Sequence, residues 1–231
     1  MKANFFITDL LGLLFPRLCH SCGQALFMHE QALCTACLYQ LPETKFHLDP
    51  ESLADQVFWG RIKIEKASAY YFYVKNGRVQ KLVHQLKYQG KKEIGIYIGE
   101  IYGRDLTEAP LYQKLNLIIP VPLHPKKMRL RGFNQSEIFA RGLAKSMNVP
   151  VNTKILYRTK ASQTQTRKSR FGRWKNVENI FTTRDDKALK NKNILLVDDV
   201  ITTGSTIEAC AHALLKAEGV KVWVVAMAFA S

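Results

Sequence analysis

The sequence predicts an α/β fold, a mostly parallel β-sheet flanked by helices, with a small N-terminal zinc-ribbon domain. Short apolar segments alternate with segments whose apolar residues recur at helical spacing, which is typical of βαβ units. Four of the five cysteines form two C-x-x-C pairs near the N-terminus. The chain has 231 residues and 47% hydrophobic content, enough to build a core. These observations predict one sheet domain with a metal-stabilised appendage.

The cysteine pairs are "CHSC" (19–22) and "CTAC" (34–37), separated by eleven residues. Two such turns can place four thiolates around one tetrahedral ion. Nothing in the sequence marks a secreted protein, so disulfides are disfavoured, and a redox C-x-x-C normally occurs once. His20 is an alternative ligand, whereas Cys210 fits a buried thiol in an apolar helix. The predicted ligands of a structural zinc ion are Cys19, Cys22, Cys34 and Cys37.

The N-terminal region is expected to form a short amphipathic helix followed by the zinc ribbon, over residues 1–45. Its apolar run is too short to span a bilayer, and it lacks a signal-peptide cleavage site, so no stable membrane insertion is expected. A metal would supply the stability that so short a segment lacks. Such a module can bind nucleic acid, bind protein or brace its neighbour. A linker is expected over 46–66 and the sheet domain over 67–231.

The sheet domain contains strands and helices in alternation. Aromatic and β-branched content predicts the first strand, and helical spacing of apolar residues predicts the helices. The expected strands are 66–74, 115–122, 152–158, 193–197 and 220–230. The expected helices are 77–88, 92–106, 135–147 and one from 205 to the stop at Gly219.

The stretch "LLVDDVITTGST" (195–206) places two acids and a row of hydroxyls after a buried strand. Ligands of parallel sheets bind at the carboxyl ends of strands, and backbone N–H groups before a helix can surround a phosphate. Asp198 and Asp199 suit ribose hydroxyls, and can hold Mg²⁺ through them. Neither a P-loop nor a G-x-G-x-x-G loop is present. The predicted phosphate-binding residues are Val200, Ile201, Thr202, Thr203, Gly204, Ser205 and Thr206.

This stretch resembles the phosphoribosyl pyrophosphate (PRPP) loop of type I phosphoribosyltransferases. The whole chain, except about 43–66, resembles the ComF family of competence proteins. The supporting stretches are "CHSCG", "LVHQLKYQGKKEIG", "IIPVPLHPKKMRLRGFNQSEIFARGLA" and "RTKASQTQTRKSRFGRWKNVENIF". The resemblance implies a type I phosphoribosyltransferase fold for 67–231 and binding of PRPP with Mg²⁺. It makes Asp198 and Asp199 the candidate catalytic residues.

Two basic loops are expected to face the same end of the sheet. The loop 120–135 holds four cations and no acid, and by similarity it is the pyrophosphate loop. The loop 154–175 holds eight cations and no acid, which suits a mobile cover, base stacking by Phe171 and Trp174, or a plain linker. Lys87 is expected either to reach a phosphate or to cap its helix. The candidate residues are Lys87, Arg129, Arg131, Gly132, Asn134, Gln135, Gln163, Arg167 and Arg170.

The formal net charge of +15 favours polyanionic partners. The resemblance implies a cytoplasmic protein of natural transformation that binds PRPP and single-stranded DNA, with other DNA-uptake proteins as further expected partners. A free-standing phosphoribosyltransferase acting on a small base or amine is the alternative. A regulator that uses PRPP as a signal is a third possibility; this class usually carries a helix-turn-helix, and none is found in the sequence. The acceptor, and whether any transfer occurs, stay open.

Overall fold

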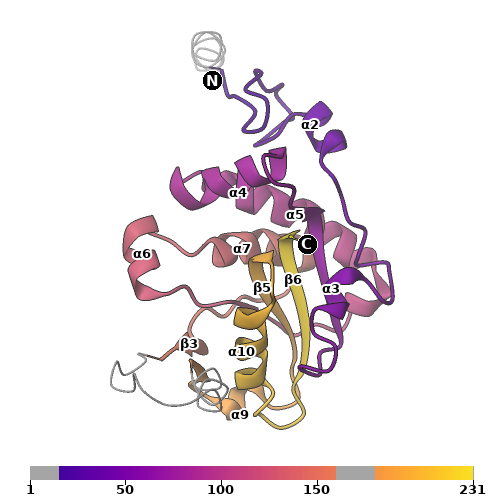
Figure 1. The fold of residues 1–231 in the computed structure, drawn as a ribbon, viewed down its shortest axis with the longest axis vertical. Helices are drawn as coiled ribbons and strands as arrows, with labels where there is room; N and C mark the ends of the chain where they lie inside the picture. Colours follow the sequence, from indigo (N-terminus) through magenta and orange to yellow (C-terminus); the bar gives the residue numbers. More distant parts are fainter. Residues whose placement is uncertain (1–15, 160–179, 231) are drawn as a thin grey trace, which may run out of the picture.

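The computed structural model describes residues 16–159 and 180–230. Its centre is a four-stranded parallel sheet with the strand order β1-β6-β5-β2 (Figure 1). The strands are β1 (Lys66–Phe72), β2 (Leu117–Pro120), β5 (Asn193–Ile201) and β6 (Lys221–Phe229). The predicted parallel sheet is therefore confirmed, and its two central strands are the longest.

Helices cover one face of this sheet. They are α4 (Arg78–Tyr88), α5 (Lys92–Glu108) and α7 (Gln135–Met147), and the short helix η1 (Pro110–Tyr112) follows α5. Helices α5 and α7 touch at backbone distance, since a Cβ on Gly142 would lie 2.2 Å from the Ile96 carbonyl oxygen. This close contact fixes α7 beside the sheet, so the first turn of α7 has a defined place near the end of β5.

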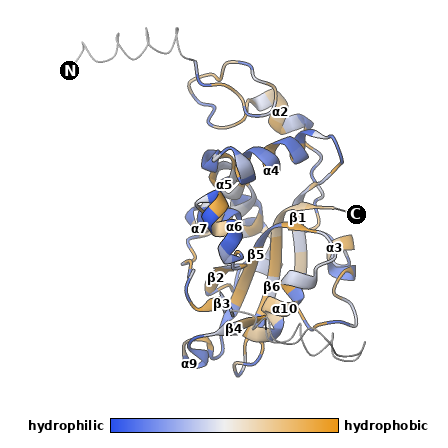
Figure 2. Cartoon of the chain, turned by 60° about the vertical axis from the view of Figure 1, so that its left-hand side comes forward, coloured by the Kyte–Doolittle hydropathy of each residue, from blue (hydrophilic) through white to orange (hydrophobic). Residues whose placement is uncertain are grey.

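The opposite face is covered by α10 (Ser205–Leu214), by α3 (Leu53–Gln56) and by a small antiparallel pair, β3 (Leu156–Arg158) with β4 (Phe181–Thr183). Alternate residues of β5 face different cores: Leu195 and Val197 contact one, and Ile194 and Leu196 contact the other. Because both faces are buried, the strand reads as a continuous apolar run. Figure 2 shows the strands mostly in hydrophobic colours and α4 and α6 mostly in hydrophilic ones.

Several expected boundaries are corrected by the structure. The predicted strand 152–158 is only β3, and it lies outside the four-stranded sheet. The C-terminal helix ends at Leu214 rather than at Gly219, which has a φ of 70° within the following turns. The expected loop 120–135 contains helix α6 (Pro125–Arg131). His124 caps α6, and Gly132, with a φ of 77°, ends it. The short helix α9 (Asp186–Leu189) lies before β5.

Residues 46–66, expected to be a linker, pack into the core. Phe46 and Phe58 are 5% and 1% exposed and belong to the same buried cluster as α10. Asp55 forms a capping box with Ser52 and a buried ion pair with Lys66. This segment therefore behaves as part of the sheet domain.

The four cysteines belong to a small unit, residues 17–41, that we call the cysteine module. It includes α2 (Thr35–Gln40) and lies beside α4 (Figure 1). Leu33 and Leu41 share a buried cluster with Val79 and Leu82 of α4. The module is thus packed on the sheet domain. The predicted N-terminal helix and most of the basic loop 154–175 lie outside the described residues. None of the helices in the described part of the chain combines the length and the hydropathy needed to cross a bilayer.

Candidate functional site

The carboxyl end of β5 carries the two acids. The sequence predicted a strand over 193–197 and a loop from 198, but β5 continues to Ile201. Asp198 and Asp199 therefore belong to the strand, and the loop that follows is only Thr202–Gly204. Hydrogen bonding to β6 continues through Ile201, so both carboxylates stand on rigid backbone.

Asp198 is held by two hydrogen bonds to one carboxylate oxygen. The Ser136 hydroxyl and the Asp199 backbone N–H donate to Oδ1, each at 2.8 Å. Burial, followed by repulsion from Asp199, raises the pKa of Asp198 to about 7, against 3.8 ordinarily. Ser136 lies in the first turn of α7, and it is absent from the residues that the sequence predicted. Its signal was its position at the start of the helix after the basic loop.

Asp199 is paired with a cation from another helix. Its Oδ2 lies 2.9 Å from Lys87 Nζ, and the two side chains are 15% and 20% exposed. Lys87 lies in the last turn of α4. The structure thus brings a predicted cation directly to a predicted carboxylate, which reduces the repulsion between the two acids.

Arg131 is the second cation of the site. Its guanidinium donates to the Tyr88 hydroxyl at 3.2 Å and lies 5.0 Å from that ring's centroid. It also donates to Gln135 Oε1 at 2.8 Å, while its buried Nε has no hydrogen-bond partner among the described residues. Asn134 bonds to backbone groups: its side chain caps α7 and donates to the Val121 carbonyl. Gln135 and Asn134 therefore orient this corner of the site.

Exposed hydroxyls surround the turn from β5 into α10. Thr202, Thr203, Ser205 and Thr206 are all exposed, and the hydroxyls of Thr203 and Ser205 lie 3.1 Å apart. Backbone N–H groups at the start of α10 add donors and a partial positive charge. Val200 and Ile201 instead belong to β5, and Ile201 is fully buried. We call the group Lys87, Arg131, Ser136, Asp198, Asp199 and Thr202–Thr206 the sheet-edge site.

A wall behind the turn was not predicted. The Arg61 guanidinium donates to the Thr203 carbonyl at 2.8 Å and pairs with Glu208. Gly204, with a φ of 71°, packs so closely that a Cβ there would lie 2.6 Å from Val57 Cγ1. The sequence signal for this wall was weak because 46–66 lacks helical periodicity.

The remaining basic residues are less enclosed. Arg129 lies on α6. The described part of the chain buries no residue of this helix. Figure 1 shows α6 standing apart from the sheet. The predicted Gln163, Arg167 and Arg170 lie outside the described residues.

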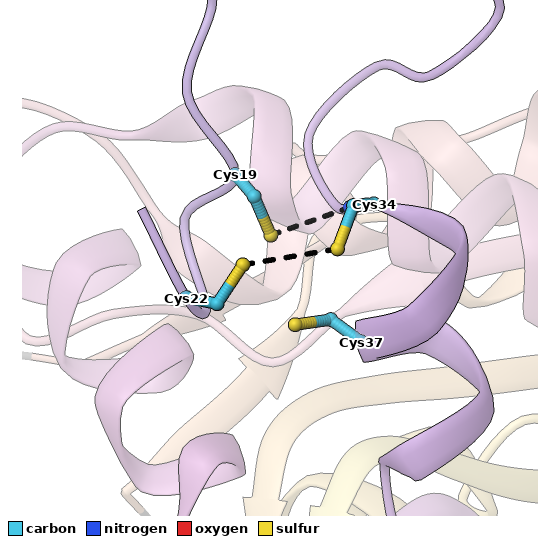
Figure 3. Close-up of side chains that lie close together, drawn as sticks. All are labelled: Cys19, Cys22, Cys34 and Cys37. Atoms are coloured by element: carbon cyan, nitrogen blue, oxygen red, sulfur yellow. Dashed lines mark hydrogen bonds between the residues drawn. The ribbon is translucent and has the colours of Figure 1, made fainter. Parts of the chain in front are cut away.

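The four predicted cysteines converge. Their sulfurs lie within 4.8 Å of one another, and those of Cys22 and Cys34 are 3.8 Å apart (Figure 3). Tetrahedral zinc with bonds of about 2.3 Å places sulfurs about 3.8 Å apart, so the geometry fits this ion. Burial tends to raise the pKa of Cys19, but the N–H groups of Cys22, Cys34 and Ser21 outweigh it and lower the pKa to about 7. The cluster could therefore hold a metal such as zinc.

Comparisons with known proteins agree with this arrangement. A family model described as a phosphoribosyl transferase domain matches residues 134–230. The DNA utilization protein YhgH of Escherichia coli (strain K12) is 33% identical over 147 residues, which cover 62% of this chain and 64% of that protein. The chain thus spans less than two thirds of this relative.

Two competence proteins are also similar. Competence protein F of Haemophilus influenzae is 31% identical over 153 residues, covering 64% of this chain and 67% of that protein. Competence protein ComFC of Bacillus subtilis (strain 168) is 29% identical over 145 residues, covering 62% of this chain and 56% of that protein. With its type I phosphoribosyltransferase domain and its four-cysteine cluster, the chain belongs to the ComF family of competence proteins.

Proposed function

We propose that the sheet-edge site binds PRPP with Mg²⁺. The observation that carries this proposal is the succession of Asp198 and Asp199, a hydroxyl-rich turn and a helix start, with Lys87 paired to Asp199. Arg131 bonds to Tyr88, the residue after Lys87. A sugar with a phosphate at one end and a diphosphate at the other has the same order of chemical groups. The matched domain and the basic charge of the chain support the proposal.

Each part of the site then has a role. The carboxylates of Asp198 and Asp199 accept hydrogen bonds from the ribose hydroxyls. The residues Thr202–Thr206 hold the 5-phosphate through hydroxyl and backbone donors, as helix starts do for anions. Arg131 faces the diphosphate and supplies guanidinium donors. When bound, Mg²⁺ neutralises charge on the diphosphate.

Lys87 has to exchange partners when the ligand enters. In the structure it neutralises Asp199 at 2.9 Å. A ribose hydroxyl on Asp199 frees the ammonium group to meet the diphosphate. Lys87 therefore reduces the repulsion between Asp198 and Asp199 before the ligand binds, and afterwards it provides a cation for the diphosphate.

If the site transfers the sugar, the bond from the anomeric carbon to the diphosphate breaks while a bond to the acceptor forms. The pyrophosphate leaves with the electron pair, and Arg131 stabilises the developing charge. The carboxylates favour a cationic sugar in the transition state. A free-standing phosphoribosyltransferase acting on a small base or amine is the alternative function.

For the whole protein we propose a role in DNA uptake, as a cytoplasmic partner of single-stranded DNA. The support is the similarity to proteins named as competence and DNA utilization proteins, together with the net charge of +15. Other DNA-uptake proteins are the further proposed partners. The cysteine cluster takes a structural zinc ion in this proposal.

The test of PRPP binding is the melting temperature. PRPP with Mg²⁺ should raise it in the wild type, and the double variant Asp198→Asn with Asp199→Asn should lose the shift. Glu218→Gln is the matched control, because Glu218 pairs with Lys190 near the amino end of β5. If PRPP raised the melting temperature of the double variant as much as that of the wild type, Asp198 and Asp199 would not bind the ribose. Release of pyrophosphate from PRPP, measured with a panel of bases, amines and DNA, separates a transferase from a binder.

The DNA partner is tested by salt dependence. Replacing Arg167, Arg170 and Trp174 with alanine should weaken binding of single-stranded DNA. The slope of log affinity against log salt concentration is negative. Its magnitude should decrease by about 0.7 for each phosphate that the loop 154–175 no longer neutralises. Unchanged affinity and slope would show that this loop does not contact DNA.

A further inference from the structure

Helix α4 connects the cysteine module with the sheet-edge site. Arg78, Lys81 and Gln85 are spaced by three and four residues, so they share one side of the helix. This side faces the cysteine module, which α4 also contacts through buried apolar residues. Lys87 follows two residues after Gln85 and reaches Asp199. A single helix thus contacts both candidate sites.

The contacts reach the turn that carries two of the cysteines. Lys81 Nζ donates to the Ser21 carbonyl at 2.9 Å, and Gln85 Nε2 donates to the His20 carbonyl at 2.7 Å. His20 and Ser21 are the two residues between Cys19 and Cys22, so α4 binds the backbone of the metal-binding turn. The ring of His20 points elsewhere, with Nε2 3.0 Å from Glu93 Oε1.

A third contact lies at the start of α4. The Arg78 guanidinium bonds to the Gln40 side chain and lies 4.0 Å from Cys37 Sγ. Both C-x-x-C turns therefore touch the helix. Gln85 is only 8% exposed, so its hydrogen bond to the turn is shielded from water.

Helix α4 depends on such contacts. It has 11 residues, its N-cap is Gly77 without a side-chain cap among the described residues, and no acid occupies its first turn. Helices shorter than about 12 to 15 residues are marginal alone, so packing decides whether this one stays formed. Loss of the metal-held turn would remove two acceptors and let α4 fray.

We propose that the metal-held turn Cys19–Cys22 positions Lys87 and Tyr88 for the phosphoribosyl ligand, through its hydrogen bonds with Lys81 and Gln85. Lys81 and Gln85 are then positioning residues of the sheet-edge site. The naming of PRPP as the ligand rests on the function proposed above, whereas the mechanical link between module and helix does not. The cysteine module is then a structural part of the ligand site.

The first experiment measures the link without any ligand. Amide hydrogen exchange over α4 is compared in the zinc-loaded wild type, the chelated wild type and the double variant Lys81→Ala with Gln85→Ala. Exchange at 82–88 should become faster in the chelated chain and in the double variant, while zinc content in the variant stays at one per chain by elemental analysis. Gln80→Ala is the matched control, because Gln80 bonds to the Asn76 N–H instead. Unchanged protection of 82–88 would overturn the proposal.

The second experiment measures the consequence by titration calorimetry with PRPP and Mg²⁺. Gln85→Ala removes the neutral hydrogen bond to the His20 carbonyl. It is expected to weaken the affinity for PRPP about two- to tenfold, with zinc retained. A double-mutant cycle of Gln85→Ala with Lys87→Ala should be non-additive, because the effect of Gln85 acts through Lys87. Additive effects would overturn the proposed route. If the wild type itself fails to bind PRPP, the proposed ligand is wrong, and hydrogen exchange still decides the link.

Discussion

The cysteine module and the sheet-edge site are assembled in opposite ways. The four sulfurs come from residues 19–37, a short stretch in which spacing alone brings them near one another. The sheet-edge site joins Lys87, Arg131, Ser136 and Asp198, which only the packing of α4, α6, α7 and β5 brings together. A local site can be recognised from a motif, whereas a distributed site needs the tertiary structure.

The two regions also differ in what stabilises them. The cysteine module has few buried apolar residues and uses polar ties, such as Glu30, whose carboxylate accepts from Thr35 and Phe27. The sheet has two buried cores that meet at β5. Removing the metal should therefore affect the first region, and steric changes behind the turn should affect the second.

The strongest effect should come from loss of the metal. Cys34→Ser with Cys37→Ser should abolish zinc binding and unfold residues 17–41, because structural zinc contributes about 10 to 16 kcal/mol in isolated zinc fingers. The sheet should stay folded, because one of its two cores contains no residue of the module and the other also draws on α4, α5, α7 and the strands. Elemental analysis and hydrogen exchange measure the two outcomes. Cys210→Ala is the matched control, because Cys210 is buried in α10 and lies outside the cluster. Retained zinc in the double serine variant would contradict the assignment.

A smaller effect is expected from Gly204→Ala, which alters the sheet-edge site alone. Its φ of 71° is strained for alanine, and the new Cβ would meet Val57 Cγ1 at 2.6 Å and Phe58 Cε1 at 2.8 Å. Left-handed strain of about 1 to 2 kcal/mol and overpacking of about 1 to 3 kcal/mol should add. Each kcal/mol lowers the melting temperature by about 2 to 4 °C in a chain of this size.

Gly132→Ala is the control for that variant. Gly132 has a similar φ of 77°, but a Cβ there meets nothing within 4 Å among the described residues. It should show the left-handed strain without the overpacking. Equal destabilisation in the two variants would show that Val57 and Phe58 do not form a firm wall behind Gly204.

The weakest effect is expected from pH. The pKa of Asp198 rises from 3.8 to about 7 in the folded protein, chiefly through burial. Between these values the folded state keeps a proton that the unfolded chain releases, so stability falls as pH rises through this window. Ligand-free, zinc-loaded protein should melt a few degrees lower at pH 7.5 than at pH 5, and Asp198→Asn should reduce that difference. An identical difference in the variant would place Asp198 in a less buried setting.

Much of the fold could be predicted from the sequence, and the errors in that prediction have physical causes. Helix α6 was missed because four of its seven residues are cations and it has no apolar face, although His124, Pro125 and Gly132 are ordinary start and stop signals. The role of 46–66 was missed because α3 has only four residues, too few for periodicity. The acids were expected in a loop because the strand's apolar run ends at Val197, whereas pairing with β6 extends it to Ile201.

Three features could be inferred from the order of amino acids alone: the cluster of four cysteines, the alternation of strands and helices, and the order of acids, hydroxyls and helix start around residue 200. They depend on local spacing and apolar periodicity, which the chain carries directly. Three contacts required the folded molecule: Lys87 pairs with Asp199, Ser136 donates to Asp198, and Gln85 of α4 donates to the His20 carbonyl. Those contacts depend on how separate helices pack on one sheet, and their partners lie up to 112 residues apart.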